Sequence, residues 1–369
     1  KRAHAAIYLR SPAIQKITGE TGMSPAEGHE KSIDAVSPDI QKRFDKLLAE
    51  PQVQEGLAFI KSDGKHRVEE QIQITEIPAP PFAEQERAED YKRRFIELGL
   101  SDVHLDAEGN CVGLLKGSGK GPKLVVSAHI DTVFPKGYNA KVTVDDKGVI
   151  HAPGIADDAA GLSALLSIVR TFKQTKIQTV GDILFVGTVG EEGRGDLRGC
   201  KHLFSTIKDI DGFISIDGDD CDSIIYLGLG SKRFEFTFKG PGGHSFGAFG
   251  EVPNPIHAMG RAIDKIANIA VPEEPRTTYA VSVVSGGTSV NSIAAEAVML
   301  TDTRSVCAQQ LDKTVSELVN CVKMAVIEEN TSLNILWDSE DNIRVEIEKI
   351  GDRPSGVCPP EALHVQVAL

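Results

Sequence analysis

Acidic residues follow apolar, strand-length segments at several separate points of this chain, and this pattern constrains the fold more than any other feature. Three such segments run directly into acids: 124–128 into His129 and Asp131, 183–189 into Glu191 and Glu192, and 213–216 into Asp217. Apolar runs of this length are typical of strands that are covered on both faces, as in α/β proteins. Because ligands bind at the carboxyl ends of such strands, the pattern predicts one edge of a sheet that carries these side chains.

A fourth acidic cluster, Asp157 and Asp158, directly precedes an amphipathic helix that we predict over residues 159–173. Carboxylates that lie side by side raise one another's pKa values, and a divalent cation is the simplest compensation for their charge. A single imidazole among the carboxylates suits zinc, manganese or cobalt better than calcium, which prefers all-oxygen sites. The four clusters together therefore predict a carboxylate-rich metal site.

Each cluster taken alone has a simpler interpretation. The histidine would be a hydrogen-bonded loop residue, the paired glutamates a solvated turn, Asp157 and Asp158 a helix cap with its neighbour, and Asp217 a turn cap. All four clusters nevertheless fall at strand-to-loop or loop-to-helix junctions, which are the places that an active site would use. This coincidence favours the joint interpretation.

Charge and composition exclude other classes of function. The chain has 40 Lys and Arg against 53 Asp and Glu, a formal net charge of −13 at pH 7, which disfavours binding to nucleic acids and to anionic membranes. No apolar run approaches the roughly 18 residues of a membrane span, and there is no HExxH, G-x-S-x-G or Walker motif. The six widely spaced cysteines favour reduced thiols in a cytoplasmic protein; residues 1–10 as the remnant of an export signal are the alternative.

The pattern of predicted strands and helices changes near residue 229, where a second block of alternating elements begins. Within this block we predict, in order, strand 233–238, helix 255–269, strands 278–284 and 297–304, helix 308–330, and strands 333–337 and 344–348. This βαββαβ-like order is long enough for a separate α+β domain inserted into the first. The expected boundaries are 1–44 for a polar N-terminal arm, 45–228 and 353–369 for the first part and the truncated second part of a main α/β domain, and 229–352 for the inserted domain.

Within the main domain, the periodicity predicts helices over residues 45–60 and 84–98. Residues 110–115 and 123–128 are joined by a Gly-rich turn and are predicted to form a hairpin. The segment 361–369 is interpreted as the start of a helix.

The spaced motifs resemble the co-catalytic zinc exopeptidase and deacylase family that includes peptidase T, glutamate carboxypeptidase, aminoacylase and succinyl-diaminopimelate desuccinylase. The matching motifs, in chain order, are Ser127–Val133, Gly154–Asp158, Gly190–Gly193, Asp217, Gly240–Ser245, Gly286–Asn291 and Asp302–Arg304. The resemblance implies a zinc-hydrolase catalytic domain with a central mixed sheet flanked by helices. It also implies that the inserted α+β block is a dimerisation domain.

The resemblance assigns roles to the acidic clusters. The ligands that it implies for two Zn²⁺ ions, with cobalt or manganese as substitutes, are His129, Asp157, Glu192 and Asp217. The first ion would take the histidine and Asp217, the second would take Glu192, and Asp157 would bridge them. Two further residues would act in catalysis: Asp131 would hold the histidine tautomer, and Glu191 would be the general base for a water between the metals.

The inserted domain is implied to complete the site. The resemblance predicts that His244 reaches across a homodimer to stabilise the oxyanion, that Asn291 hydrogen-bonds the substrate, and that Arg304 pairs with a substrate carboxylate. Without the resemblance, the first two would be turn residues and the arginine a surface residue.

One ligand departs from the pattern. The family completes its second zinc with a histidine in a segment after the inserted domain, and the only histidine there, His364, lacks that context. We therefore expect that the chain as given lacks the last ligand and binds the second metal weakly. The expected function is cleavage of the peptide bond of small peptides, because residues 190–197 and 242–247 look closest to the di- and tripeptidase branch. The alternatives are an N-acyl-amino-acid deacylase and a non-catalytic family member.

Overall fold

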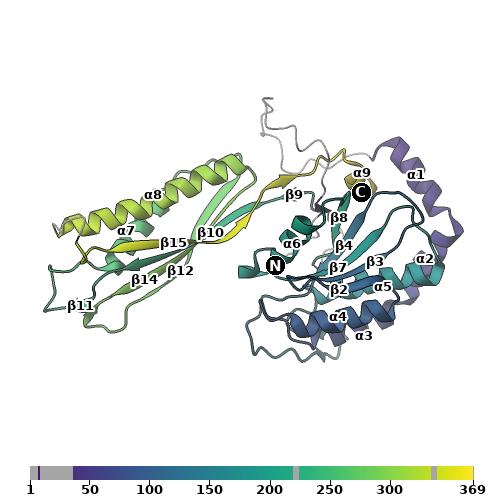
Figure 1. The fold of residues 1–369 in the computed structure, drawn as a ribbon, viewed down its shortest axis with the longest axis horizontal. Helices are drawn as coiled ribbons and strands as arrows, with labels where there is room; N and C mark the ends of the chain where they lie inside the picture. Colours follow the sequence, from purple (N-terminus) through teal and green to yellow (C-terminus); the bar gives the residue numbers. More distant parts are fainter. Residues whose placement is uncertain (1–6, 9–35, 219–223, 334–338, 369) are drawn as a thin grey trace. The chain divides into compact units, whose positions relative to one another are not determined.

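The computed structural model describes residues 7–8, 36–218, 224–333 and 339–368. Within this part, the chain forms two compact units, each with its own core (Figure 1). Unit 1 contains the described residues up to 227 and from 357 onward, and unit 2 contains the described residues from 228 to 356. Among the described residues, no helix combines the length and apolar character needed to cross a membrane, and the five described cysteines are free thiols.

Unit 1 is built on a six-stranded mixed sheet, which confirms the predicted α/β fold class. The strand order is β1-β8-β4-β7-β3-β2. The bounds are β1 Ile7–Tyr8, β2 Ser101–Leu105, β3 Cys111–Leu115, β4 Leu124–His129, β7 Ile183–Thr188 and β8 Gly212–Ser215. Strand β4 lies between β7 and β8 and runs parallel to both, whereas the outer pairs are antiparallel. Three parallel strands therefore end at the same edge of the sheet.

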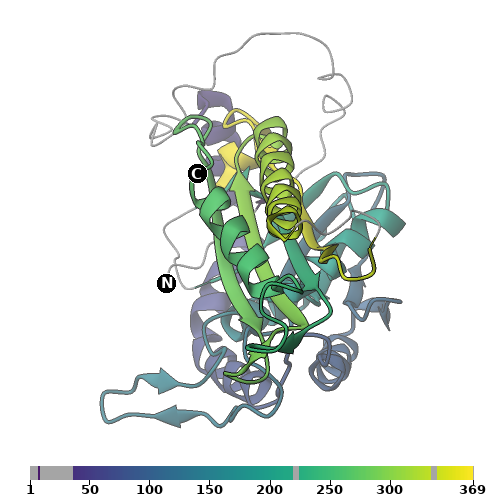
Figure 2. The ribbon, with the colours of Figure 1, turned by 90° about the vertical axis from the view of Figure 1, so that its left-hand side faces the viewer.

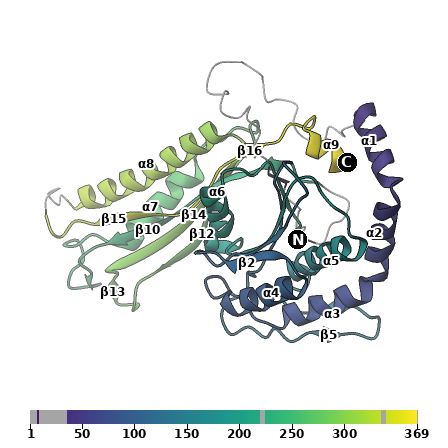
Figure 3. The same ribbon diagram turned by 45° about the vertical axis from the view of Figure 1, so that its right-hand side comes forward.

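Helices cover both faces of this sheet, which explains the uninterrupted apolar runs (Figure 3). Val126 and Phe185 pack with residues of α3, α4 and α5, whereas Val125 and Val186 point to the opposite face and pack with Leu203 of α6. The bounds are α3 Gly64–Thr75, α4 Gln85–Glu97, α5 Ala159–Thr175 and α6 Arg198–Thr206.

The remaining elements of unit 1 are short or peripheral. They are α1 Pro38–Leu48, α2 Pro51–Ser62, β5 Thr143–Val144, β6 Ile150–His151, the 3-10 turn η2 Gly193–Gly195 and α9 Leu363–Ala368. Strands β5 and β6 form a hairpin that projects from the unit (Figure 2).

The single helix predicted over 45–60 is wrong, because the helix is interrupted at Glu50 and a new helix begins at Pro51. Most of the predicted arm at 1–44 lies outside the described residues, but α1 already begins at Pro38.

The hairpin predicted between residues 110–115 and 123–128 is also wrong. Strand β7 lies between β3 and β4, and it pairs antiparallel with the first and parallel with the second. The glycines of the presumed turn serve a different purpose: a Cβ at Gly117 or Gly121 would lie 2.4 Å from the backbone of Gly181. The Gly-rich segment therefore lets the chain pass closely over the start of β7.

Unit 2 has the predicted βαββαβ order. Its four-stranded antiparallel sheet has the order β12-β14-β10-β15. The bounds are β10 Gly230–Lys239, α7 Pro255–Ala267, β12 Thr277–Gly286, β14 Glu296–Ser305, α8 Ala308–Ser332 and β15 Arg344–Arg353. Helices α7 and α8 pack on one face through a core that includes Phe236, Met259 and Val322 (Figures 2 and 3).

Short two-stranded ladders complete the described structure. β11 Gly243–His244 pairs with β13 Ser292–Ile293 in unit 2, and β9 Leu227–Gly228 pairs with β16 Gly356–Val357. The strand predicted over 333–337 falls almost wholly outside the described residues, and Leu333 caps the end of α8. The predicted start of a helix in 361–369 corresponds to α9.

Candidate metal centre

The acidic rim is the edge of the unit 1 sheet where β4, β7 and β8 end. Its members, which come from these three strand ends and from the start of α5, are His129, Asp131, Asp157, Glu191, Glu192 and Asp217. Parallel pairing places the strand ends next to each other, because His129 is the register partner of Thr188 on β7 and Ser127 that of Ser215 on β8. The sequence pattern and the sheet topology therefore agree on where the acids gather.

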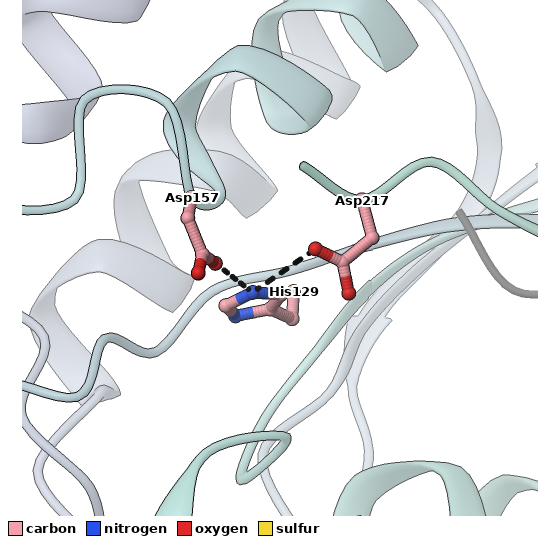
Figure 4. A group of neighbouring side chains, drawn as sticks. All are labelled: His129, Asp157 and Asp217. Carbon is pink, nitrogen blue, oxygen red and sulfur yellow. Dashed lines mark hydrogen bonds and ion pairs between the residues drawn. The ribbon is translucent and has the colours of Figure 1, made fainter. Parts of the chain in front are cut away.

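His129 lies at the centre of the rim and is only 2% exposed. Its Nε2 atom lies 2.8 Å from Asp157 Oδ1 and 3.9 Å from Asp217 Oδ1 (Figure 4). The Asp157 side chain is 44% exposed and that of Asp217 is 20% exposed. The buried imidazole thus faces two carboxylates at the mouth of the site.

Asp131 links the segments that follow β4 and β7. Its fully buried carboxylate accepts the backbone N–H groups of Glu191 at 3.0 Å and Glu192 at 2.8 Å. Its Oδ1 atom also lies 3.5 Å from Nδ1 of His129. Burial raises the pKa of Asp131, but the histidine and these N–H groups outweigh it, so that the pKa is lowered overall. Asp131 therefore stays ionised as the partner of the imidazole.

Asp157 and Asp158 have different roles. The fully buried side chain of Asp158 accepts the N–H of Gly161 at 3.0 Å and that of His129 at 2.8 Å, so it caps α5 and fixes the end of β4. Burial raises the pKa of Asp158 well above its usual range, with Asp217 and Asp157 adding repulsion and His129 opposing it. The simple helix-cap interpretation holds for Asp158, whereas Asp157 points to the histidine.

Burial and, to a smaller extent, repulsion between carboxylates raise the pKa values of two residues of the rim. Burial raises the pKa of Glu192 to about 7, with a further contribution from Glu191. Burial also raises the pKa of Asp217 to about 6, with repulsion from Glu191 and Asp157 added and attraction by His129 opposing it. A divalent cation would relieve this excess of negative charge.

The donor atoms fit such a cation. In each of two groups of residues, the ligand atoms lie within 4.8 Å of one another. One group is His129 with Asp157 and Asp217, and the other is His129 with Glu191 and Glu192. One imidazole nitrogen with two carboxylate oxygens suits Zn²⁺ and leaves a coordination position open, as catalytic zinc sites do. Among the described residues, no second histidine joins either group, and His364 Nε2 lies 2.8 Å from Cys358 Sγ instead.

The three residues predicted from the inserted domain all belong to unit 2. His244 and Asn291 are neighbours there, because Gly243 and His244 pair with Ile293 and Ser292, and the Asn291 carbonyl accepts the N–H of Ser245. Nδ1 of His244 accepts the N–H groups of Phe246 and Gly247 at 3.2 and 3.3 Å. Arg304 lies on β14, where its Nε donates to Asp302 at 2.7 Å.

The sequence analysis missed Arg87, which is fully buried in α4 beside the rim. Its guanidinium donates to the carbonyl oxygen of Ile130, between His129 and Asp131. A signal was present, because Arg87 precedes Tyr91 and Phe95 at intervals of four residues and so occupies the core-facing stripe of the predicted helix.

Known proteins share sequence with this chain. The sequence profile of peptidase family M20/M25/M40 matches residues 125–367. The chain is 27% identical over 266 residues to the uncharacterized protein YqjE of Bacillus subtilis, which covers 69% of this chain and 70% of that protein. It is 34% identical over 137 residues to an N-formyl-4-amino-5-aminomethyl-2-methylpyrimidine deformylase of Halalkalibacterium halodurans, with 33% of this chain and 32% of the relative covered.

Solved structures show the same fold. A tripeptidase from Staphylococcus aureus superposes with a TM-score of 0.65 at 24% sequence identity, and the match covers 82% of this chain and 80% of that one. The profile match extends over well more than half of the chain, and it confirms the resemblance inferred from the motifs. The chain belongs to peptidase family M20/M25/M40, a family of hydrolases.

Proposed function

We propose that this protein is a metal-dependent exopeptidase that hydrolyses the peptide bond of di- or tripeptides. The observation that carries the proposal is the buried His129 imidazole, 2.8 Å from Asp157 and in reach of Asp217, with the Glu191–Glu192 pair on the same rim. A tripeptidase from Staphylococcus aureus has the same fold at 24% sequence identity, so the fold is compatible with cleavage of peptides.

The proposed ligands of a first zinc ion are His129, Asp157 and Asp217, and Glu192 would hold a second ion that shares Asp157. When bound, the metal would lower the pKa of water and polarise the scissile carbonyl. The second ion has fewer protein ligands among the described residues, so we expect it to bind more weakly than the first.

Glu191 is the proposed general base. Its backbone N–H donates to the Asp131 carboxylate, and this hydrogen bond fixes the Glu191 backbone at the rim. The Glu191 carboxylate takes a proton from the attacking water and passes it to the leaving amine. Adjacent glutamates can divide the work in this way, because a carboxylate that serves as a metal ligand is a poor proton shuttle.

Unit 2 supplies the proposed substrate contacts. Because Nδ1 of His244 accepts two backbone N–H groups, the ring proton lies on Nε2, which can donate to the oxyanion that develops on the substrate. Asn291 would hydrogen-bond the substrate, and Arg304 would pair with its carboxylate. In this proposal the histidine acts on the site of a second copy in a homodimer.

The exposed edge of unit 2 supports dimerisation. Strand β12 is ten residues long and lies at the edge of the four-stranded sheet, with Val283 49% and Val284 54% exposed. A long, partly apolar edge strand offers unpaired N–H and C=O groups to another chain.

The second candidate is an N-acyl-amino-acid deacylase that uses the same rim. The 34% identity to a deformylase favours it, because that protein removes an acyl group and not an amino acid. A third candidate, a non-catalytic member, follows from the short supply of ligands for a second metal.

A substrate panel with Zn²⁺ present separates these candidates. Dipeptides and tripeptides are compared with N-formyl, N-acetyl and N-succinyl amino acids, and bound metal is counted by elemental analysis after dialysis. We expect turnover of the peptides with at least one tightly held zinc ion per chain. Activity on the acyl compounds alone would replace the proposal with the deacylase, and bound zinc without any turnover would favour the non-catalytic member.

A further inference from the structure

Arg87 is a buried cation whose partners are all neutral. The residue is 0% exposed, and no carboxylate lies within ion-pair distance of it in the described part of the chain. Its guanidinium donates to the carbonyl oxygens of Ile77 and Ile130 at 2.8 Å and of Thr75 at 3.3 Å, and to the Tyr138 hydroxyl at 3.5 Å. A buried charge without a direct counter-ion is costly, so it calls for an explanation beyond packing.

Arg94, on the same helix, shows the ordinary arrangement. It is 8% exposed and forms ion pairs with Asp90 at 2.7 Å and Glu70 at 3.5 Å. Its burial is compensated locally, and its contacts join helices to one another. Arg87 differs because its guanidinium donates to three backbone carbonyls from two segments, Thr75 and Ile77 at the end of α3 and Ile130 after β4.

The carbonyl of Ile130 is the contact that matters for the rim. Ile130 lies between His129 and Asp131, and its own N–H donates to the Thr188 carbonyl at 2.7 Å on β7. Arg87 therefore holds the other side of this residue, so the backbone on which both side chains stand is fixed from two directions. A small rotation there would move the imidazole and its carboxylate partner together.

The positive charge of Arg87 also interacts favourably with buried carboxylates of unit 1. Asp131 and Asp158 are both 0% exposed, and both attract Arg87 through the dry interior of unit 1. Burial nevertheless lowers the pKa of Arg87 overall. A permanent cation behind two buried carboxylates offsets part of their charge before any metal binds.

We propose that Arg87 is a positioning residue of the metal centre: by holding the Ile130 carbonyl it fixes His129 and Asp131 in the geometry that binds the metal. The inference rests on the proposed function in one respect, namely that the acidic rim takes Zn²⁺. It adds a residue that touches neither metal nor substrate and belongs to a helix outside the rim.

Zinc affinity of the metal-free protein tests the proposal without an activity assay. Zn²⁺ is titrated against a chromophoric chelator for the unsubstituted chain and for Arg87→Met, Arg87→Lys and Arg94→Met. We expect zinc binding about 10–100-fold weaker for both Arg87 variants, because changes of this size follow loss of the groups that orient metal ligands. Lysine keeps the charge, but its compact ammonium does not reproduce the planar, spread-out donors of the guanidinium, so it should not rescue the affinity. Arg94→Met should bind within about twofold of the unsubstituted chain, since its contacts lie away from the rim.

Hydrogen exchange of the metal-free proteins gives a second readout. The amides of residues 129–132 should exchange faster in both Arg87 variants and remain unchanged in Arg94→Met. Arg87 variants with unchanged zinc affinity and unchanged exchange at 129–132 would overturn the proposal. If the unsubstituted chain binds no zinc, the proposed function fails, and the exchange comparison still decides whether Arg87 holds this segment. Should Arg87→Met not fold, Arg87→Lys alone provides both readouts.

Discussion

The acidic rim of unit 1 and the loops of unit 2 that carry His244 and Asn291 are organised in opposite ways. In the rim, His129 and Asp131 are buried and held by backbone N–H groups, a helix cap and a buried arginine. In the unit 2 loops, His244 is exposed, and nearby Phe246 and Val290 are 90% and 103% exposed. The difference indicates that the rim is organised within its own unit, whereas the side chains of the unit 2 loops have little packing in unit 2, as our proposal that they contact a partner or substrate requires.

The largest expected effect is on kcat, and it distinguishes the roles of Glu191 and Glu192. Glu191→Gln should lower kcat by about 10²–10⁴-fold and leave the zinc content unchanged, because it removes a proton acceptor and not a ligand. Glu192→Gln is the matched control, and it should lower both activity and zinc content. Steady-state kinetics on the best peptide substrate and elemental analysis provide the measurements. Loss of zinc in Glu191→Gln would reverse the assignment of the two residues.

The next effect concerns the unit 2 loops. His244→Ala should lower kcat by about 10²–10³-fold, the usual result of removing an oxyanion donor. The zinc content and the unfolding temperature should stay unchanged, because the side chain is exposed. His257→Ala, an exposed histidine of α7, serves as the control.

A mixing experiment shows whether His244 acts across a dimer. An equal mixture of Glu191→Gln and His244→Ala chains, allowed to exchange subunits, should recover about a quarter of the normal active sites, since half the dimers are mixed and each has one complete site. Absence of any recovery would place the histidine in the site of its own chain or would exclude the dimer.

An intermediate effect is expected on stability as a function of pH. Burial raises the pKa of Glu192 to about 7 and that of Asp217 to about 6, above their ordinary 4.5 and 3.8. The unfolded chain therefore ionises first, so stability present below about pH 4 is lost as the pH rises through 6 and 7. Burial alone would lower the pKa of His129, but its hydrogen bonds to Asp131 and Asp157 raise the pKa overall. The histidine therefore acts in the same direction, because this attraction is lost as it deprotonates.

The unfolding temperature of the metal-free protein should thus fall between pH 5 and pH 7.5, and Zn²⁺ should restore it at pH 7.5. Glu192→Gln should flatten the fall, because glutamine does not titrate. A constant unfolding temperature over this range would contradict the idea that the rim is strained by its own charge.

The smallest effect on stability is expected in the unit 2 loops. Phe246→Ser should change the free energy of unfolding by no more than about 0.5 kcal/mol, since the ring is 90% exposed. It should instead change KM for the peptide substrate. Phe236→Ala in the unit 2 core is the contrast and should cost about 3–5 kcal/mol. Unchanged KM would exclude Phe246 from the substrate surface.

Local patterns predicted much of this fold because they report local physics. The apolar runs at 124–128 and 183–189 are strands buried on both faces, and the βαββαβ order of unit 2 follows from its periodicities. The failures have local causes too. A proline divided the helix predicted over 45–60, and glycines that allow close passage over Gly181 were mistaken for a hairpin turn.

The sequence alone determined the fold class, the family and the set of acids that gather at one sheet edge, since the acids follow strands closely in the chain or, for Asp157, directly precede a helix. Only the tertiary structure decided that β7 lies between β3 and β4, that Asp158 accepts the backbone N–H of His129, and that Arg87 holds Ile130. The physical reason is distance along the chain. The periodicity of the sequence reveals whether a residue is buried, but its partner depends on which elements pack together. Arg87, for example, is separated by 43 residues from Ile130, whose carbonyl it binds.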